Sequence, residues 1–132
     1  MQYNVYQARL NKDQRNAVNT NGWDGHWAYA DLSMINQKNA AERVKAGLGY
    51  YKHQWVLTEH DLSSVFETLN TTYAADWRGT NARSASVGDI VIEGLSGIGY
   101  VCCLFGWELL PTSLVKELQA TIVTTIPNLS AA

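Results

Sequence analysis

Alternating apolar and polar residues in two stretches of the chain predict two β-strands. In residues Gln2 to Ala8, Tyr3 and Val5 share one face, and the stretch is rich in the aromatic and β-branched residues that favour strands. Residues Tyr50 to Leu57 show the same alternation. One face of this second strand is expected to carry four large side chains, namely Tyr51, His53, Trp55 and Leu57.

Two apolar runs in the C-terminal half predict a β-hairpin. Ser86 to Glu93 and Gly99 to Trp107 are rich in β-branched or aromatic residues, and Gly88–Asp89 is expected to form a turn in which the carboxylate accepts hydrogen bonds from neighbouring amides. Both faces of the second run are apolar, which is typical of a central strand. Cys102 and Cys103 lie within it and point to opposite faces, so they cannot form an unstrained disulfide. We expect two buried, unreactive thiols.

Helical spacing of apolar residues predicts four helices. The clearest runs from Asp61 to Leu69, where apolar residues recur at intervals of three and four and Thr58 is positioned to cap the first turn. A mostly solvated helix is predicted over Lys12 to Asn19, behind the cap residue Asn11. The two other helices are predicted over Asn39 to Gly47 and Pro111 to Leu118. A final β-branched segment, Thr121 to Ile126, fits either a strand or an ordered tail.

Two polar stretches between these elements, Asn19 to Trp27 and Asn70 to Arg83, are predicted to be loops because Asn and Gly tolerate positive φ. The chain of 132 residues is close to the usual size of one domain. Hydrophobic residues make up 46% of it and charged residues 17%, which is enough apolar material for a core. We therefore predict a single α+β domain over residues 1–132, with a mostly antiparallel sheet and helices packed on it.

The charge pattern argues against nucleic-acid binding. The net charge is -2 and the ten basic residues are scattered, so only Arg9, Lys12 and Arg15 could form a basic patch. No run approaches the length of about 18 apolar residues that a membrane span needs, and the N-terminus lacks the pattern of a secretion signal. Without a disulfide framework the chain suits a reducing compartment. We expect a cytoplasmic protein that makes no contact with a membrane.

Three short motifs occur in order between Asp61 and Leu110. The first lies in the predicted Asp61 helix, and the other two lie in the two strands of the predicted hairpin. Their residues are Asp61, Leu62, Val65, Phe66, Glu67 and Asn70; Arg83, Ser84, Ser86, Val87, Gly88, Asp89, Ile90 and Val91; and Tyr100, Val101, Phe105, Gly106, Trp107 and Glu108. This order and spacing resemble a family of small phage and mobile-element proteins related to the YodL-like domain.

The resemblance covers residues 61–110 well, with 111–132 as a C-terminal extension that many proteins of that family lack. The adjacent Cys102 and Cys103 also depart from the family pattern, in which Asp or Ser is commoner there. The resemblance implies a phage or mobile-element origin, and hence the cytoplasm of an infected bacterial host. It implies no catalytic residue.

The aromatic segment after the first helix is the strongest candidate for a binding surface. Trp and Tyr provide large, rigid contact areas and are enriched at binding hot spots. The alternative is that Trp23 and Trp27 close over the sheet as core residues, and Trp77 in the second loop has the same two interpretations. The predicted partner-binding residues are Trp23, Asp24, His26, Trp27, Tyr29 and Trp77.

Three residues around the start of the predicted hairpin support a different function. Arg83, Ser84 and Ser86 could bind an anion such as a phosphate, because a guanidinium group and hydroxyls suit that geometry. The chain would then be a small-ligand or nucleotide-binding module. The simpler interpretation is that Arg83 pairs with the carboxylate of Asp89 or Glu108.

Catalysis and metal binding have the weakest support. Asp24 and His26 could provide acid–base chemistry in a small hydrolase or transferase. No spacing of His and Cys matches a metal site, and we expect neither a metal nor another cofactor. The leading hypothesis is therefore a non-enzymatic phage accessory protein that binds and modulates a host protein, to take over the host or counter its defence. A homo-oligomer is compatible with each hypothesis.

Overall fold

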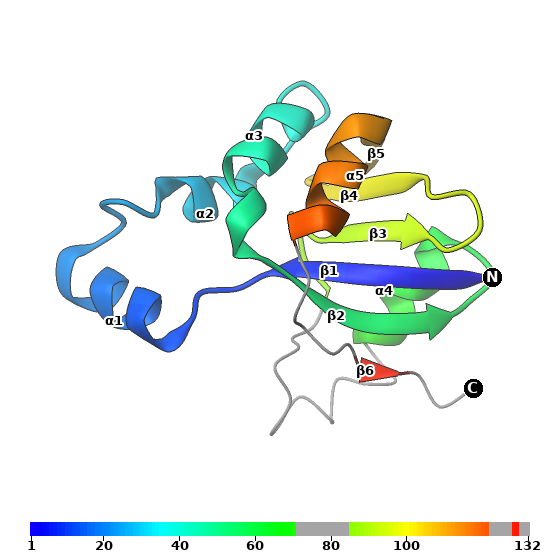
Figure 1. The fold of residues 1–132 in the computed structure, drawn as a ribbon, viewed down its shortest axis with the longest axis horizontal. Coiled ribbons are helices and arrows are strands. Elements are labelled where there is room, and N and C mark those ends of the chain that lie inside the picture. The colour runs from blue at the N-terminus through cyan, green and yellow to red at the C-terminus, as the bar shows by residue number, and fades with distance from the viewer. Residues whose placement is uncertain (71–84, 122–127, 130–132) are drawn as a thin grey trace.

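A computed structural model of the chain describes residues 1–70, 85–121 and 128–129, and its architecture is α+β as predicted. The strands are β1 Gln2–Ala8, β2 Tyr51–Thr58, β3 Ile90–Glu93, β4 Gly99–Cys103, β5 Gly106–Leu109 and β6 Asn128–Leu129. They form one sheet with the order β5-β4-β3-β1-β2-β6 (Figure 1). Neighbouring strands are antiparallel except for β2 and β6, which pair in parallel.

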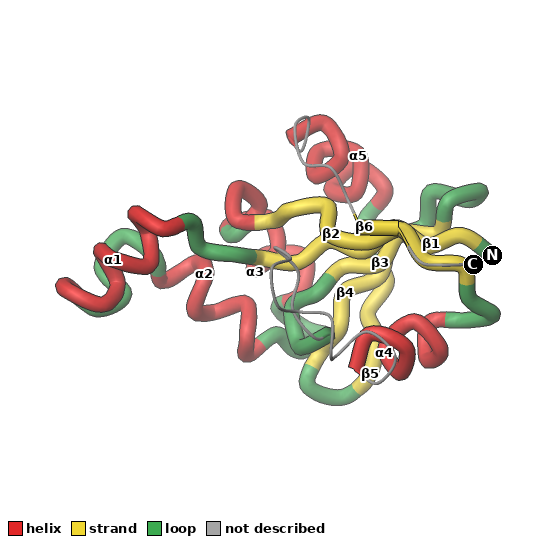
Figure 2. Tube along the Cα trace, turned by 90° about the horizontal axis from the view of Figure 1, so that it is seen from below, coloured by secondary structure: helices red, strands yellow, loops and turns green. Residues whose placement is uncertain are grey.

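Helices cover both faces of the sheet. They are α1 Lys12–Asn21, α2 Trp27–Asp31, α3 Ala40–Ala46, α4 Leu62–Asn70 and α5 Thr112–Thr121, with short 3-10 helices η1 Leu32–Met34 and η2 Leu48–Tyr50. Figure 2 shows α4 and α5 on opposite sides of the sheet, while α1 and α2 extend beyond one end of it (Figure 1). No helix within the described ranges is both long and apolar enough to cross a membrane.

Two clusters of buried side chains hold these layers together. On one face, residues of the sheet pack against η1, α3 and α5, with Leu32, Val44 and Leu118 among the helical contributions. On the other face the cluster includes Val65 and Leu69 from α4. Because each large aliphatic side chain contributes roughly 1.5–3 kcal/mol when fully buried, both faces of the sheet stabilise the fold.

A β-bulge in β2 divides its large side chains between the two clusters. Val5 of β1 pairs with Trp55, but the next residue of β1, Tyr6, pairs with His53, so Gln54 is an extra residue in β2. An extra residue reverses the alternation of faces beyond it. Tyr51 accordingly belongs to the α3–α5 cluster and Trp55 to the α4 cluster. The prediction that these side chains share one face was therefore wrong.

The predicted strand from Gly99 to Trp107 is two strands. The chain turns at Leu104 and Phe105, and Gly106 begins β5 with a φ of +91°, a conformation that glycine adopts without strain. As predicted, β4 has a neighbour on each side, β3 and β5. Both thiols in β4 are free and buried, and desolvation raises the pKa of Cys102 to about 11.

The four predicted helices are present, with differences at their ends. α1 extends to Asn21 behind a complete capping box, in which Asn11 Oδ1 accepts from the Gln14 amide at 2.8 Å and Gln14 Oε1 accepts from the Asn11 amide at 2.9 Å. At α4 the cap is Asp61, whose carboxylate accepts from the Ser64 amide at 2.8 Å, and not Thr58.

The predicted loops and tail are only partly described. The Asn19–Trp27 loop is shorter than predicted because α1 ends within it and α2, which has no counterpart in the prediction, begins at Trp27. The predicted loop beyond Asn70 falls in residues 71–84, outside the described residues. Of the segment Thr121 to Ile126, the structure describes Thr121, which ends α5.

Candidate binding site

Residues 12–31, which comprise α1, α2 and the turn between them, form an arm at one end of the sheet (Figure 1). Neither α1 nor α2 contains a buried residue. An isolated helix of this length is marginally stable, so α1 depends on its capping box more than on packing. Trp27 begins α2 and is 58% exposed, and Met34, just after the arm, is exposed to the same extent. The arm therefore presents apolar surface and contributes little to the core.

Four aromatic rings attach the arm to the rest of the protein. Trp23 stacks on Tyr29 with ring centroids 6.0 Å apart, and Tyr29 meets Tyr50 edge-on at 5.3 Å. His26 Nδ1 and the Tyr50 hydroxyl lie 2.6 Å apart and share a hydrogen bond. Tyr50 ends η2 directly before β2. The arm is thus tied to the sheet through the start of β2.

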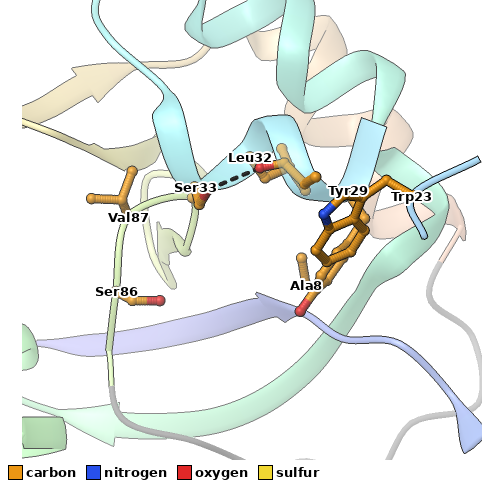
Figure 3. A pocket seen from close by; sticks show the side chains of 9 residues that line it. Ala8, Trp23, Tyr29, Leu32, Ser33, Ser86 and Val87 are labelled. Carbon is orange, nitrogen blue, oxygen red and sulfur yellow. Dashed lines mark hydrogen bonds between the residues drawn. The ribbon is translucent and has the colours of Figure 1, made fainter. Parts of the chain in front are cut away.

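A pocket of about 340 Å³ lies where the arm meets the segment that enters β3 (Figure 3). Figure 3 shows Trp23 and Tyr29 side by side on one wall, with Ser86 and Val87 on the other. Leu32 and Ser33 of η1 lie between these walls, and the lining is completed by Ala8, Ala30 and Gly88. The pocket therefore combines aromatic rings, hydroxyl groups and backbone from segments far apart in the sequence.

The wall opposite the aromatic pair is a turn fixed from several directions. Gly88 has a φ of +95°, and its carbonyl accepts a hydrogen bond from the hydroxyl of the buried Tyr51. Asp89 is 1% exposed, and its Oδ2 accepts from the Ser86 amide at 2.8 Å and from Gln7 Nε2 at 3.1 Å. The predicted turn, with a carboxylate that accepts from a neighbouring amide, is confirmed. Because its hydrogen bonds reach β1 and β2, this wall is anchored to the centre of the sheet.

No known protein family, curated protein or solved structure matches the chain. The proposals for a binding surface and a ligand pocket therefore rest on the geometry of its own residues.

Some of the predicted site residues line this pocket, and others lie away from it. Trp23 and Tyr29, from the predicted partner-binding set, and Ser86, from the predicted anion site, all line the pocket. Asp24 is exposed, as is Trp27, and neither lines it. Trp77, Arg83 and Ser84 lie outside the described residues. Two predictions made for different functions thus converge on one pocket.

The arrangement gives little support to acid–base or metal chemistry. His26 is half-buried and engaged with Tyr50, and within the described residues no hydrogen bond or ion pair joins it to Asp24. Within the described ranges, no three His, Cys, Asp or Glu side chains form a group that could hold a metal ion.

Sequence reasoning missed the part of the lining that comes from η1. Leu32 is buried and Ser33 Oγ donates a hydrogen bond to the Ala30 carbonyl at 2.8 Å. The signal for this segment was weak, because a five-residue helix followed by one 3-10 turn is too short to establish a helical period. Gly88 was correctly placed in a turn, but nothing in the sequence indicated that this turn faces the arm.

Two further cavities lie away from the arm. One, of about 370 Å³, lies between α4 and the β4–β5 hairpin, where Phe66 meets Trp107 edge-on with ring centroids 6.3 Å apart. The other, of about 460 Å³, lies between α3 and α5 beside the ion pair of Lys45 and Glu117, whose charged atoms are 2.8 Å apart. Neither contains a residue of the predicted sites.

Proposed function

We propose that this chain is a non-enzymatic accessory protein that binds and modulates another protein through the arm, with Trp27 at the centre of the contact. The observation that carries this proposal is the 58% exposure of Trp27 on a helix with no buried residue. Moving a large indole from water into a partner's surface is favourable in free energy, and Trp is among the residues that dominate binding energy at interfaces. Such a residue contributes nothing comparable to this fold.

The surface around Trp27 defines the chemistry of the partner. Asp31 and Met34 follow Trp27 by four and seven residues, a spacing that puts all three on one side of the α2–η1 segment. Met34 adds a second exposed apolar side chain, while Asp31 and Asp24 are exposed carboxylates. The complementary partner surface is an apolar depression with basic residues at its rim.

The partner is proposed to be a bacterial host protein in the cytoplasm. This part of the proposal rests on the resemblance of residues 61–110 to phage and mobile-element proteins. In that setting, occupying a site on a host protein would either redirect the host or suppress its defence.

The test is affinity capture from bacterial lysate with three versions of the tagged chain. The wild type is expected to retain one stoichiometric partner, and Trp27→Ala is expected to lose it. Phe105→Ala is the matched control, because Phe105 is an 86% exposed aromatic residue in the β4–β5 turn, outside the arm. Retention of the partner by Trp27→Ala, or equal loss from both variants, would refute the proposed surface.

A second candidate function is a small-ligand-binding module. One observation favours it, since Ser86 from the predicted ligand set lines a pocket together with Trp23 and Tyr29. This function uses the inner side of the arm and leaves Trp27 free for a partner.

A further inference from the structure

The pocket between the arm and the β3 turn has the features of a site for a flat, uncharged ring. We propose that it binds the base of a nucleoside, with the base stacked on Trp23. This inference rests on the second candidate function, ligand binding, and is independent of the protein-binding surface at Trp27. It also differs from the predicted anion site, because it assigns recognition to the ring and not to a phosphate.

The aromatic wall provides the stacking surface. Trp23 is half-buried, and one face of its indole is occupied by Tyr29, whose ring is inclined by 29°. Within the described residues no second aromatic ring is stacked on Trp23. Stacking of a base on such a ring contributes about 1–3 kcal/mol and tolerates every base, because each has a flat π surface. The Tyr29 ring behind the indole holds that surface in position.

The rest of the described lining matches the polar edges of a base. No Lys, Arg, His, Asp or Glu side chain is among the described residues that line the pocket. The polar side-chain groups among the described lining residues are the hydroxyls of Ser33, Ser86 and Tyr29 and the indole N–H of Trp23. Since Ser33 Oγ already donates to the Ala30 carbonyl, it faces a ligand as an acceptor. A neutral heterocycle has both donors and acceptors for such a set.

The size and rigidity of the pocket agree with this ligand. A volume of about 340 Å³ is near the lower end of the range for small-molecule sites, roughly 300–1,000 Å³. The Gly88 wall is held in place by the hydrogen bond from the Tyr51 hydroxyl to its carbonyl, and it packs so closely on η1 that a Cβ added there would lie 2.7 Å from the Leu32 carbonyl oxygen. A site that is formed before its ligand arrives loses less entropy on binding.

The test is a calorimetric titration of the full chain with adenosine, guanosine, cytidine and uridine, and with AMP for comparison. At least one nucleoside is expected to bind saturably with one-to-one stoichiometry. Trp23→Ala is expected to weaken that binding about tenfold or more, given the energy of base stacking. Phe105→Ala is the matched control, because it removes an exposed aromatic ring that does not line the pocket, and its Kd is expected to stay within about twofold of wild type. Trp23→Phe, which keeps a stacking ring, is expected to restore most of the affinity.

Three outcomes would overturn the inference. Binding of AMP with no binding of adenosine would move recognition to a phosphate site while leaving ligand binding as a function. No binding of any of the five compounds at millimolar concentration would rule out both the nucleoside site and the ligand-binding function. Equal weakening by Trp23→Ala and Phe105→Ala would show that the loss of affinity does not come from the pocket. Partner capture through Trp27 is a separate measurement and stands or falls separately.

Discussion

Replacing Gly88 with alanine is expected to destabilise the protein by about 2–5 kcal/mol. A φ of +95° costs a residue with a Cβ roughly 1–2 kcal/mol. The added Cβ would also lie 2.7 Å from the Leu32 carbonyl oxygen, which belongs to backbone and cannot swing aside as a side chain would. Overpacking of this kind costs typically about 1–3 kcal/mol. The sum is a large part of the total of about 5–15 kcal/mol that stabilises a small domain.

Alanine substitutions at two other glycines separate the backbone cost from the cost of the steric contact. Gly97 has a φ of +72° with nothing within 4 Å of an added Cβ, so Gly97→Ala is expected to show the backbone cost alone, about 1–2 kcal/mol. Gly49 has neither a positive φ nor a close neighbour, so Gly49→Ala is expected to be neutral or stabilising by up to about 1 kcal/mol.

Urea unfolding, followed by tryptophan fluorescence, gives the free energy of unfolding of all three variants. The values are comparable when the slope of this free energy against urea concentration is the same for each. Gly49→Ala is expected to be the most stable variant, Gly97→Ala the next and Gly88→Ala the least stable. If Gly88→Ala is no less stable than Gly97→Ala, the contact with Leu32 is not a constraint, and the argument for a rigid pocket wall fails with it.

Three further predictions concern buried polar and titratable groups. Burial lowers the pKa of His53 below its usual 6.5, so the folded state binds fewer protons than the unfolded state, and stability is expected to fall as the pH drops from 6.5 through the folded pKa. His53→Phe is expected to remove this loss of stability at low pH, measured as the difference in Tm between pH 7.5 and pH 5. His60→Phe is the control, because His60 is exposed, and it is expected to keep the loss. Cys102 and Cys103 are expected to react with a thiol reagent at pH 8 only after unfolding; rapid labelling of the native protein would contradict their burial. Asp89→Asn is expected to cost about 1–3 kcal/mol in urea unfolding, because a neutral amide oxygen accepts from Gln7 and Ser86 more weakly than a carboxylate and the new NH2 group adds donors to a buried position; an unchanged midpoint would rule this out.

The elements whose pattern is local could be read from the sequence. β1 and α4 are recognisable because their apolar residues repeat with the period of one strand or one helix. The bulge at Gln54 could not be predicted, because it exists only in the register between β2 and β1. At the β4–β5 turn, Gly106 was a signal for a break, but the continuous apolar run around it favoured a single strand.

The candidate site was predictable in its parts and not as a whole. Trp23 and Tyr29 attract attention as aromatic residues in a glycine-containing segment, and Ser86 as a hydroxyl beside an arginine. That they line one pocket follows from the packing of η1 against the β3 turn, which brings Leu32 onto Gly88. Contacts between segments so far apart in the chain leave no periodic trace in a single sequence. The distinction between an attached Trp23 and an exposed Trp27 likewise depends on tertiary contacts, because Trp23 stacks on Tyr29 and Tyr29 in turn packs on the distant Tyr50.

The interior position of β1 has a consequence for synthesis on the ribosome. β1 precedes every other described element, yet it lies between β2 and β3, and β3 ends only at Glu93. A nascent chain can pair β1 with β2 on one side, but the other edge of β1 has no native neighbour until β3 has been made. An open strand edge is a template for pairing with another chain. The emerging protein is therefore most vulnerable to aggregation in this interval, and slow translation between β2 and β3 would lengthen the exposure.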